Sequence, residues 1–373
     1  MRGIVIAALG MLVALAPAYA EEDVVESNLE RLEKAMASPA ATGLLVTSVG
    51  PGSQAAEKGI AVGDIVTSYD GAPTPTLEAL GAAKGKAESA GKATMPVTLV
   101  AADGAPRTIE LGSGPIGIGA SAVEKGKAAG ALPPATPFAF DFEGVKAQAH
   151  DDWYTFHFGD GPKVGFEHGM LEAKGDRLVM RREVAFDGGE QWGVNHFDVT
   201  IEMTLTSPPR PHRIRFANPA TGYWAEGKRL EDGQWHFEWT KEGEDEGTET
   251  KTVGLPEGLP VIPTYLVETL AAFLPRKAGT CWHYRPMVDS NGEAMLPACL
   301  IVVGKETVKL AQGEVDAWKV EQRQLGGQVG GTYWISDAGR IVKSFYGMPV
   351  ALLDTKEAAL KDLHAAIKPT TAD

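Results

Sequence analysis

Histidine and acidic residues cluster in one stretch of the chain, where they could bind a metal ion or transfer protons. His150, His157 and His168 lie among aspartates and glutamates there. Their spacing matches no recognised set of metal ligands. Residues seven positions apart on a continuous strand also point to opposite faces of a sheet. We therefore predict no metal site and expect these histidines on strand faces or in loops.

Short motifs that would mark a catalytic centre are missing. The chain has no Gly-x-Ser-x-Gly, no Asp-Thr-Gly or Asp-Ser-Gly, no phosphate-binding Gly-x-x-x-x-Gly-Lys-Ser/Thr and no His-Glu-x-x-His. A Ser-His-Asp triad assembled from distant residues would leave no such motif, so that possibility stays open. We predict no catalytic residues and no cofactor, and we expect that the protein is not an enzyme.

The two cysteines, Cys281 and Cys299, flank a segment that is typical of a tight turn. Residues 289–292 read Asp-Ser-Asn-Gly, and Asn and Gly tolerate the positive φ angles of such turns. Folding the chain there places Cys281 opposite residue 300, one position from Cys299. We predict a disulfide across this hairpin, with two free buried thiols as the alternative.

Charged residues limit the choice of partners. The formal net charge of −14 argues against nucleic acid and anionic membrane surfaces, because both attract Lys- and Arg-rich proteins. The acidic run at 242–247 lacks the spacing of a calcium loop, so we interpret it as a solvated turn. We interpret the basic pair Arg181-Arg182 and the stretch from Arg210 to Arg215 as solvated faces.

The N-terminal residues have the pattern of a secretory signal. Arg2 precedes an apolar run from Gly3 to Ala16, and Ala18-Tyr19-Ala20 offers small residues for cleavage. So short a run suits a signal peptide better than a membrane anchor, which is the alternative. We expect a signal peptide at 1–20 and a periplasmic or secreted protein with no membrane span in the mature chain.

Aromatic residues divide the chain into two parts. Only Tyr19 and Tyr69 precede Phe138, whereas every Trp and every His lies at or beyond His150. Two separately built hydrophobic cores are the simplest explanation. A length of 373 residues allows this, since one domain takes roughly 100–200 residues.

Helix and strand signals alternate in the first part of the chain. An N-terminal segment at 21–41 contains a predicted amphipathic helix over 24–36. Ser53 and Thr76 are suitable N-caps for two further helices. The elements expected beyond this segment are a strand at 44–49, a helix at 54–58, a strand at 65–69, a helix to about 89, and strands at 96–100 and 107–111.

These elements carry motifs that resemble a bacterial PDZ domain. The motifs are Gly43-Leu44-Leu45-Val46, Pro51-Gly52-Ser53-Gln54-Ala55-Ala56-Glu57-Lys58-Gly59-Ile60, Val62-Gly63-Asp64-Ile65-Val66 and Tyr69-Asp70-Gly71. The resemblance covers about residues 42–121. It implies that an extended peptide, usually a C-terminus, binds as an added strand at a sheet edge.

One loop departs from the usual bacterial order. No Gly-hydrophobic-Gly-hydrophobic segment precedes the strand at 44–49, whereas residues 114–119 read Gly-Pro-Ile-Gly-Ile-Gly. This segment resembles the carboxylate-binding loop and peptide-pairing strand in a permuted position, as in site-2 proteases, although a protease domain is missing. A simple interdomain link is the alternative. The resemblance implies a peptide groove between Pro115, Ile116, Gly117 and Ile118 on one side and Leu77, Leu80 and Ala83 on the other.

The remainder of the chain is predicted to be rich in β-strands. Residues 122–136 have the Ala, Gly and Pro content of a linker, and 137–368 hold strand-like runs that alternate apolar and polar residues. We expect an antiparallel curved sheet or half-barrel with helices at 263–274 and 354–367, then a tail at 369–373. The fold class is α+β.

The C-terminal part also carries a resemblance. The hairpin at 332–343 is similar to one in secreted β-rich families of unknown function, which themselves resemble the half-barrels of lipoprotein carriers. We interpret the many aromatic residues as core, with an apolar ligand cavity as the alternative.

These features favour the binding of peptides or proteins, rather than catalysis, as the function. We expect a periplasmic or secreted, non-enzymatic protein whose PDZ domain captures peptides or C-terminal protein tails. The β-rich domain would bind a second partner or an apolar ligand. The alternatives are an envelope carrier of lipid or lipoprotein, and an accessory subunit of a peripheral protease or hydrolase.

Overall fold

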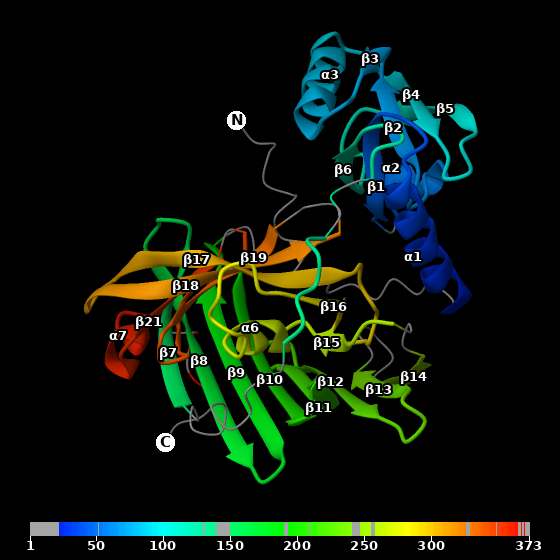
Figure 1. Cartoon of the computed structure of the whole chain (residues 1–373). Coiled ribbons are helices and arrows are strands. Elements are labelled where there is room, and N and C mark those ends of the chain that lie inside the picture. The colour runs from blue at the N-terminus through cyan, green and yellow to red at the C-terminus, as the bar shows by residue number, and fades with distance from the viewer. Residues whose placement is uncertain are drawn as a thin grey trace. The chain divides into compact units, whose positions relative to one another are not determined.

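The computed structural model divides the chain into two compact units between Leu132 and Pro133, each of which is described by itself (Figure 1). The predicted signal peptide, most of the acidic run and most of the predicted tail lie outside the described residues. In the described part, no helix is both long and apolar enough to cross a membrane. The residues left out are 1–21, 51, 129, 131, 139, 141–149, 190–192, 208, 241–246, 255–257, 326–328, 348, 365, 366, 368 and 370–373.

The first unit contains a six-stranded sheet with strand order β5-β4-β2-β1-β6, and β3 pairs with β2. The predicted strands and helices between residues 44 and 111 are all present. The last strand, β6, runs into the segment predicted as a linker. The elements are α1 (Glu22–Ala37), β1 (Gly43–Val49), α2 (Gln54–Glu57), β2 (Ile65–Tyr69), β3 (Ala72–Pro73), α3 (Leu77–Ser89), β4 (Thr94–Val100), β5 (Pro106–Gly112) and β6 (Ile118–Val123).

Local signals place the helices of this unit. The Ser53 hydroxyl accepts a hydrogen bond from the Ala56 amide at 3.2 Å and so begins α2. Thr76 begins α3 in the same way. Gly59, with φ of 67°, follows α2 in the left-handed conformation that ends many helices. The core of this unit is aliphatic except for Tyr69, which is fully buried.

The second unit is dominated by one sheet of 15 strands. Strands β7 to β14 follow one another across it, and the chain returns so that β21 pairs with β7, followed in spatial order by β20 down to β15. The pairs are antiparallel apart from β15 with β16. This agrees with the predicted mainly antiparallel, α+β fold.

The bounds of the second unit's elements are β7 (His150–Phe158), β8 (Lys163–Lys174), β9 (Arg177–Asp187), β10 (Val194–Thr204), β11 (Arg210–Asn218), β12 (Tyr223–Arg229), β13 (Trp235–Thr240), β14 (Thr248–Val253), β15 (Val261–Pro263), α6 (Leu266–Ala271), β16 (Cys281–Met287), β17 (Ala298–Leu310), β18 (Gly313–Gln324), β19 (Val329–Ser336), β20 (Ile341–Phe345), β21 (Pro349–Asp354) and α7 (Lys356–Leu360).

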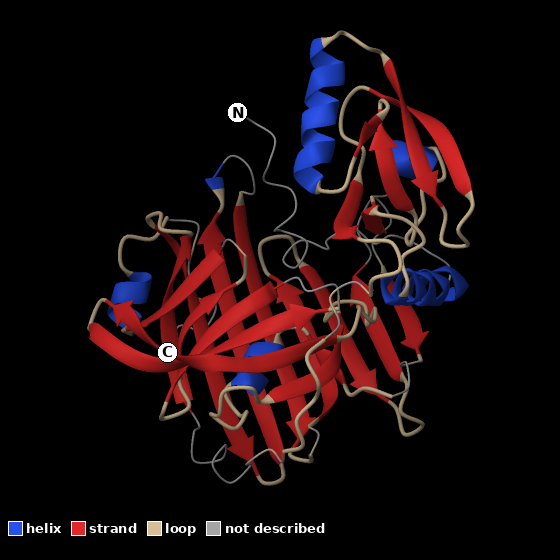
Figure 2. Cartoon of the chain, turned by 45° about the horizontal axis from the view of Figure 1, so that its top comes forward, coloured by secondary structure: helices blue, strands red, loops and turns tan. Residues whose placement is uncertain are grey.

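The sheet curves around the short helix α6, which contacts both β15 and β19 (Figure 2). Aromatic side chains fill much of the interior. The buried rings include Trp153, Tyr154, Phe156, Phe166, Phe186, Phe197, Phe216, Trp235, Phe237, Phe273, Trp282, Tyr284, Tyr333 and Trp334.

Both helices predicted in this part are shorter than expected. Pro263 belongs to β15 rather than to a helical turn, because the segment before it pairs with β16. The C-terminal helix begins as predicted, with Thr355 accepting a hydrogen bond from the Ala358 amide at 3.1 Å. It ends at Leu360 instead of continuing to Ile367, and Asp362 has a positive φ of 54° that is incompatible with an α-helix.

The predicted disulfide is wrong in this structure, where Cys281 and Cys299 are both free and buried. Cys281 pairs with Ile301, and Cys299 pairs with His283, so the cysteines are diagonal neighbours rather than a directly opposed pair. Diagonal positions lie roughly 7–8 Å apart, which exceeds the usual separation in a disulfide. The hairpin register therefore makes the two cysteines diagonal neighbours on one face of the sheet, and they are not joined by a disulfide.

The end of the predicted linker packs against β16 within the second unit. The Thr136 amide donates to the Cys281 carbonyl oxygen at 2.9 Å, and the His283 ring lies 2.6 Å from the Pro133 carbonyl oxygen. Residues 133–136 are therefore part of the second unit.

Candidate functional site

The sequence-predicted peptide-binding residues meet at one end of the first sheet. β6 is the terminal strand on this side, since it pairs with β1 and with no other described strand. Helix α3 contacts both β6 and β2. The unpaired edge of β6 and the helix α3 are therefore neighbours, which is the arrangement that strand addition beside a helix requires.

The loop before β6 is tied down through its carbonyl groups. The Ile116 carbonyl oxygen accepts a hydrogen bond from the Ala55 amide at 3.0 Å, and the Gly117 carbonyl oxygen accepts one from the Gly50 amide at 2.8 Å. Within the part of the chain that the structure describes, the amides of Ile116 and Gly117 donate to no acceptor. Two adjacent N–H groups are thus available for an anion such as a carboxylate.

Two residues at the start of α2 fix this loop. The Gln54 side-chain amide donates to the carbonyl oxygens of Ser113 and Pro115, at 3.3 and 3.1 Å, and its carbonyl oxygen accepts from the Gly112 amide at 2.7 Å. The Ser53 hydroxyl donates to the Gly117 carbonyl oxygen at 3.4 Å. Gln54 therefore acts as a positioning residue for the loop.

Gly117 is a position in this loop that no other residue can fill without strain and without a collision. Its φ is 81°, in the region that favours glycine. A Cβ atom at this position would lie 2.2 Å from the Cβ atom of Ser53. The close approach of the loop to α2 therefore depends on the missing side chain.

The apolar residues predicted for the site differ in burial. Leu80 and Ala83 belong to the core of the first unit, each with 8% exposure, while the half-buried Ile116 and Ile118 pack against that core. Leu77, at the first turn of α3, is 48% exposed. Ile118 is the first residue of β6, whereas Pro115, Ile116 and Gly117 form the preceding loop. Leu77 and the two isoleucines are therefore the residues that an apolar guest side chain could contact.

A cluster of charged and polar side chains lies in the interior of the second unit. Arg182 of β9 forms ion pairs with Glu167 of β8, at 2.7 Å, and with Glu268 of α6. Tyr346 hydrogen-bonds to both Arg182 and Glu268, and Ser344 donates to Glu268. These contacts attach α6 to β8 and β9 in one part of the sheet and to β20 in another.

This cluster corrects the prediction that Arg181 and Arg182 together form a solvated face. Alternation along β9 sends the two side chains to opposite faces, so that Arg181 is exposed while Arg182 is 7% exposed. The partner Glu268 lies far along the chain, and no local pattern indicates the pairing. We interpret the role of the cluster as structural: its buried members hold α6 in place.

Burial also changes the proton affinity of two carboxyl groups. Burial and the nearby Glu268 raise the pKa of Glu167 to about 7 against the opposing effect of Arg182. Burial raises the pKa of Asp289 to about 7, although Thr264 and Tyr265 donate hydrogen bonds to it. Both groups bind protons more tightly in the folded than in the unfolded chain.

The expected consequence is a protein that loses stability as the pH rises from 5 to 7. A carboxyl with a raised folded pKa contributes its full stabilisation below the unfolded pKa and loses it as the pH approaches the folded pKa. Each pKa unit corresponds to about 1.4 kcal/mol, so we expect a loss of at least about 1 kcal/mol. Denaturant unfolding at the two pH values measures this, and Glu167→Gln should reduce the loss. Equal stability at both pH values in the unmodified protein would contradict the interpretation.

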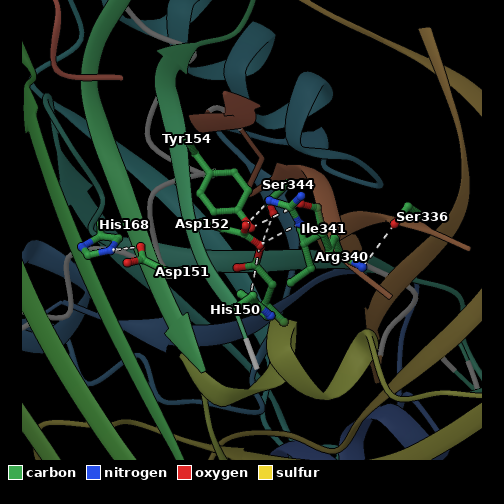
Figure 3. A network of polar contacts seen from close by, with 10 residues as sticks. His150, Asp151, Asp152, Tyr154, His168, Ser336, Arg340, Ile341 and Ser344 are labelled. Carbon is green, nitrogen blue, oxygen red and sulfur yellow. Dashed lines mark hydrogen bonds and ion pairs between the residues drawn. The ribbon is translucent and has the colours of Figure 1, made fainter. Parts of the chain in front are cut away.

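The histidines of the acidic stretch take part in separate pairs (Figure 3). The His168 ring lies 2.6 Å from the Asp151 carboxylate, and the His150 ring lies 3.6 Å from Asp152, which also pairs with Arg340. Among the described residues, no three His, Cys, Asp or Glu side chains converge as a metal site would require. The arrangement is one of paired polar contacts on and between strands.

Comparison with protein families agrees with the geometry of the first unit. The family model of the PDZ domain matches residues 45–89, from β1 to the end of α3, and stops before β6. No curated protein matches the chain. The order of the elements, the motifs and the family match together establish that the chain contains a PDZ domain.

Proposed function

We propose that this protein is a periplasmic or secreted, non-enzymatic protein that captures extended peptides or C-terminal protein tails. The peptide would add to the edge of β6, with its terminal carboxylate at the amides of Ile116 and Gly117. Its last side chain would lie between Ile116, Ile118 and Leu77. In this proposal the PDZ domain is permuted, because the loop and the pairing strand follow the other strands instead of preceding them.

The observation that carries the proposal is the loop before β6. Its carbonyl groups are engaged by Gly50 and Ala55, and Gln54 holds its two ends, while two adjacent amides have no acceptor in the described part of the chain. A simple linker has no need of such anchoring. The open strand edge beside this loop supplies hydrogen bonds to a peptide of any sequence, and the apolar residues supply selectivity.

A binding role is supported for the protein as a whole by the missing catalytic motifs and by the aromatic filling of the second unit. The predicted signal pattern supports the periplasmic or secreted location. The second unit would then serve as a platform for another ligand or partner.

A C-terminal peptide library tests the proposal. We expect enrichment of peptides with a free carboxylate and an apolar last residue, with dissociation constants of about 1–100 μM. Amidation of the peptide C-terminus should weaken binding at least about tenfold, because the two loop amides lose their anionic acceptor. Absence of enrichment, or equal binding of the amidated peptides, would rule out terminal-carboxylate recognition.

A further inference from the structure

Two buried thiols contact each other on one face of the second unit's sheet, and the proposed peptide binding does not involve them. Cys281 of β16 and Cys299 of β17 are diagonal neighbours, and both are free. Their exposed fractions are 1% and 0%. The side chains of the two cysteines also form a hydrogen bond with each other. The two sulfur atoms are therefore neighbours without being covalently bonded.

The spacing of the two cysteines suits an ion held between their sulfur atoms. Diagonal residues of neighbouring strands have Cα atoms roughly 7–8 Å apart, which is longer than the separation that a disulfide usually spans. Metal–thiolate bonds are about 2.3 Å long, so an ion held linearly by two thiolates places the sulfur atoms roughly 4.5 Å apart. Two thiols that already contact each other can reach this spacing with small side-chain rotations.

The number and type of ligands select the ion. In the described part of the chain, no three His, Cys, Asp or Glu side chains converge, so the thiols act as a pair. Structural zinc sites need four ligands, and calcium and magnesium bind oxygen ligands. Soft thiolate ligands favour Cu(I), an ion that accepts two ligands in a linear arrangement. The pair therefore fits a soft monovalent cation.

His283 supplies a base beside the pair. Its Nε2 atom lies 2.6 Å from the Pro133 carbonyl oxygen, so we assign the ring proton to Nε2. The other ring nitrogen is then able to accept a proton, and the His283 side chain hydrogen-bonds to the Cys281 thiol. His283 is only partly buried, so a path for protons and ions leads past this ring.

Charged residues of β18 balance the charge of a bound ion. Two thiolates and Cu(I) together carry one negative charge. Arg323 pairs directly with Cys299 across the strands and acts electrostatically on both thiols. Its partner Glu321, at 2.7 Å, also pairs with Lys319 at 3.3 Å. These three charged residues together carry one positive charge, which offsets that of the complex.

We infer that Cys281 and Cys299 bind one Cu(I) ion between their thiolates. Binding replaces the two thiol protons, which pass to the solvent, and the ion keeps its oxidation state. The inference rests on the second unit alone and does not depend on the proposed peptide site of the first.

Anaerobic titration of the full, reduced chain against a chelator that competes for Cu(I) tests the inference. Ag(I), which has the same preference for two soft ligands, is titrated in parallel as a probe that resists oxidation. We expect one ion per chain, with a dissociation constant for Cu(I) below about 10 nM. Weaker binding of Cu(I), or the absence of a saturable site, would overturn the inference.

Matched variants locate the ion. Cys281→Ala and Cys299→Ala should each weaken Cu(I) binding at least about 100-fold, because one thiolate alone leaves the ion with a single soft ligand. Met287→Leu is the control, since it removes the other sulfur atom of β16 and should leave the affinity unchanged. Tryptophan fluorescence during denaturant unfolding verifies that each variant is folded. Tight binding that survives either cysteine substitution would contradict the inference.

Discussion

Replacement of Arg182 by methionine is expected to lower the free energy of unfolding of the second unit by about 3–5 kcal/mol. The substitution leaves Glu167 and Glu268 facing each other with 3% and 4% exposure and no cation between them. Removing one partner of a buried ion pair is costly because the remaining charge must stay desolvated or take up a proton. Release of α6 from the sheet would follow.

Tryptophan fluorescence during denaturant unfolding measures this effect. Every tryptophan of the chain belongs to the second unit, so the signal reports on that unit selectively. Arg181→Met is the matched control, since Arg181 is the adjacent, exposed residue of the same strand, and we expect a change within about 0.5 kcal/mol.

A combined variant identifies the source of the loss. Adding Glu167→Gln and Glu268→Gln to Arg182→Met removes both carboxylates and should restore part of the lost stability. A cost below about 1 kcal/mol for Arg182→Met alone would show that the cluster does not hold α6 as we describe.

Replacement of Gly117 by alanine is expected to weaken peptide binding at least about 30-fold, which corresponds to about 2 kcal/mol. The positive φ of 81° disfavours alanine, and its Cβ atom would lie 2.2 Å from that of Ser53. The loop must therefore move away from α2, which displaces the amides of Ile116 and Gly117. Fluorescence anisotropy with a labelled apolar-ended peptide measures the affinity.

Gly104→Ala is the control for this variant. Gly104 also has a positive φ, of 89°, but a Cβ atom at this position would meet no heavy atom within 4 Å. This variant carries the backbone strain without the collision and lies in the turn between β4 and β5. Equal affinity of the two variants would contradict the proposed role of the loop.

Much of the first unit could be predicted because its signals are local. Ser53 and Thr76 cap helices, and the glycine and aspartate turns separate strands of alternating residues. The role of Gln54 was missed, because its partners at residues 112–115 lie about sixty positions along the chain. A glutamine at the start of a helix gives no sign of such a contact.

The fold class of the second unit could be predicted from the sequence, but the side-chain contacts in its interior could not. Alternation indicated an antiparallel sheet, yet it could not show that α6 places Glu268 against Arg182. The disulfide prediction failed because the hairpin register differs by one residue from the expected one. Cys281 lies opposite Ile301 instead of residue 300. Nonlocal pairing and register depend on tertiary packing, which a single sequence does not display.

The central claim is that a peptide terminus binds at the loop before β6 and at the edge of that strand. Backbone amide chemical shifts of the full chain, recorded during titration with an apolar-ended peptide, test it most directly. We predict that the largest saturable changes occur at Ile116, Gly117 and the residues of β6, and that the amidated peptide produces much smaller ones. Changes confined to other parts of the chain, or equal changes with both peptides, would contradict the claim.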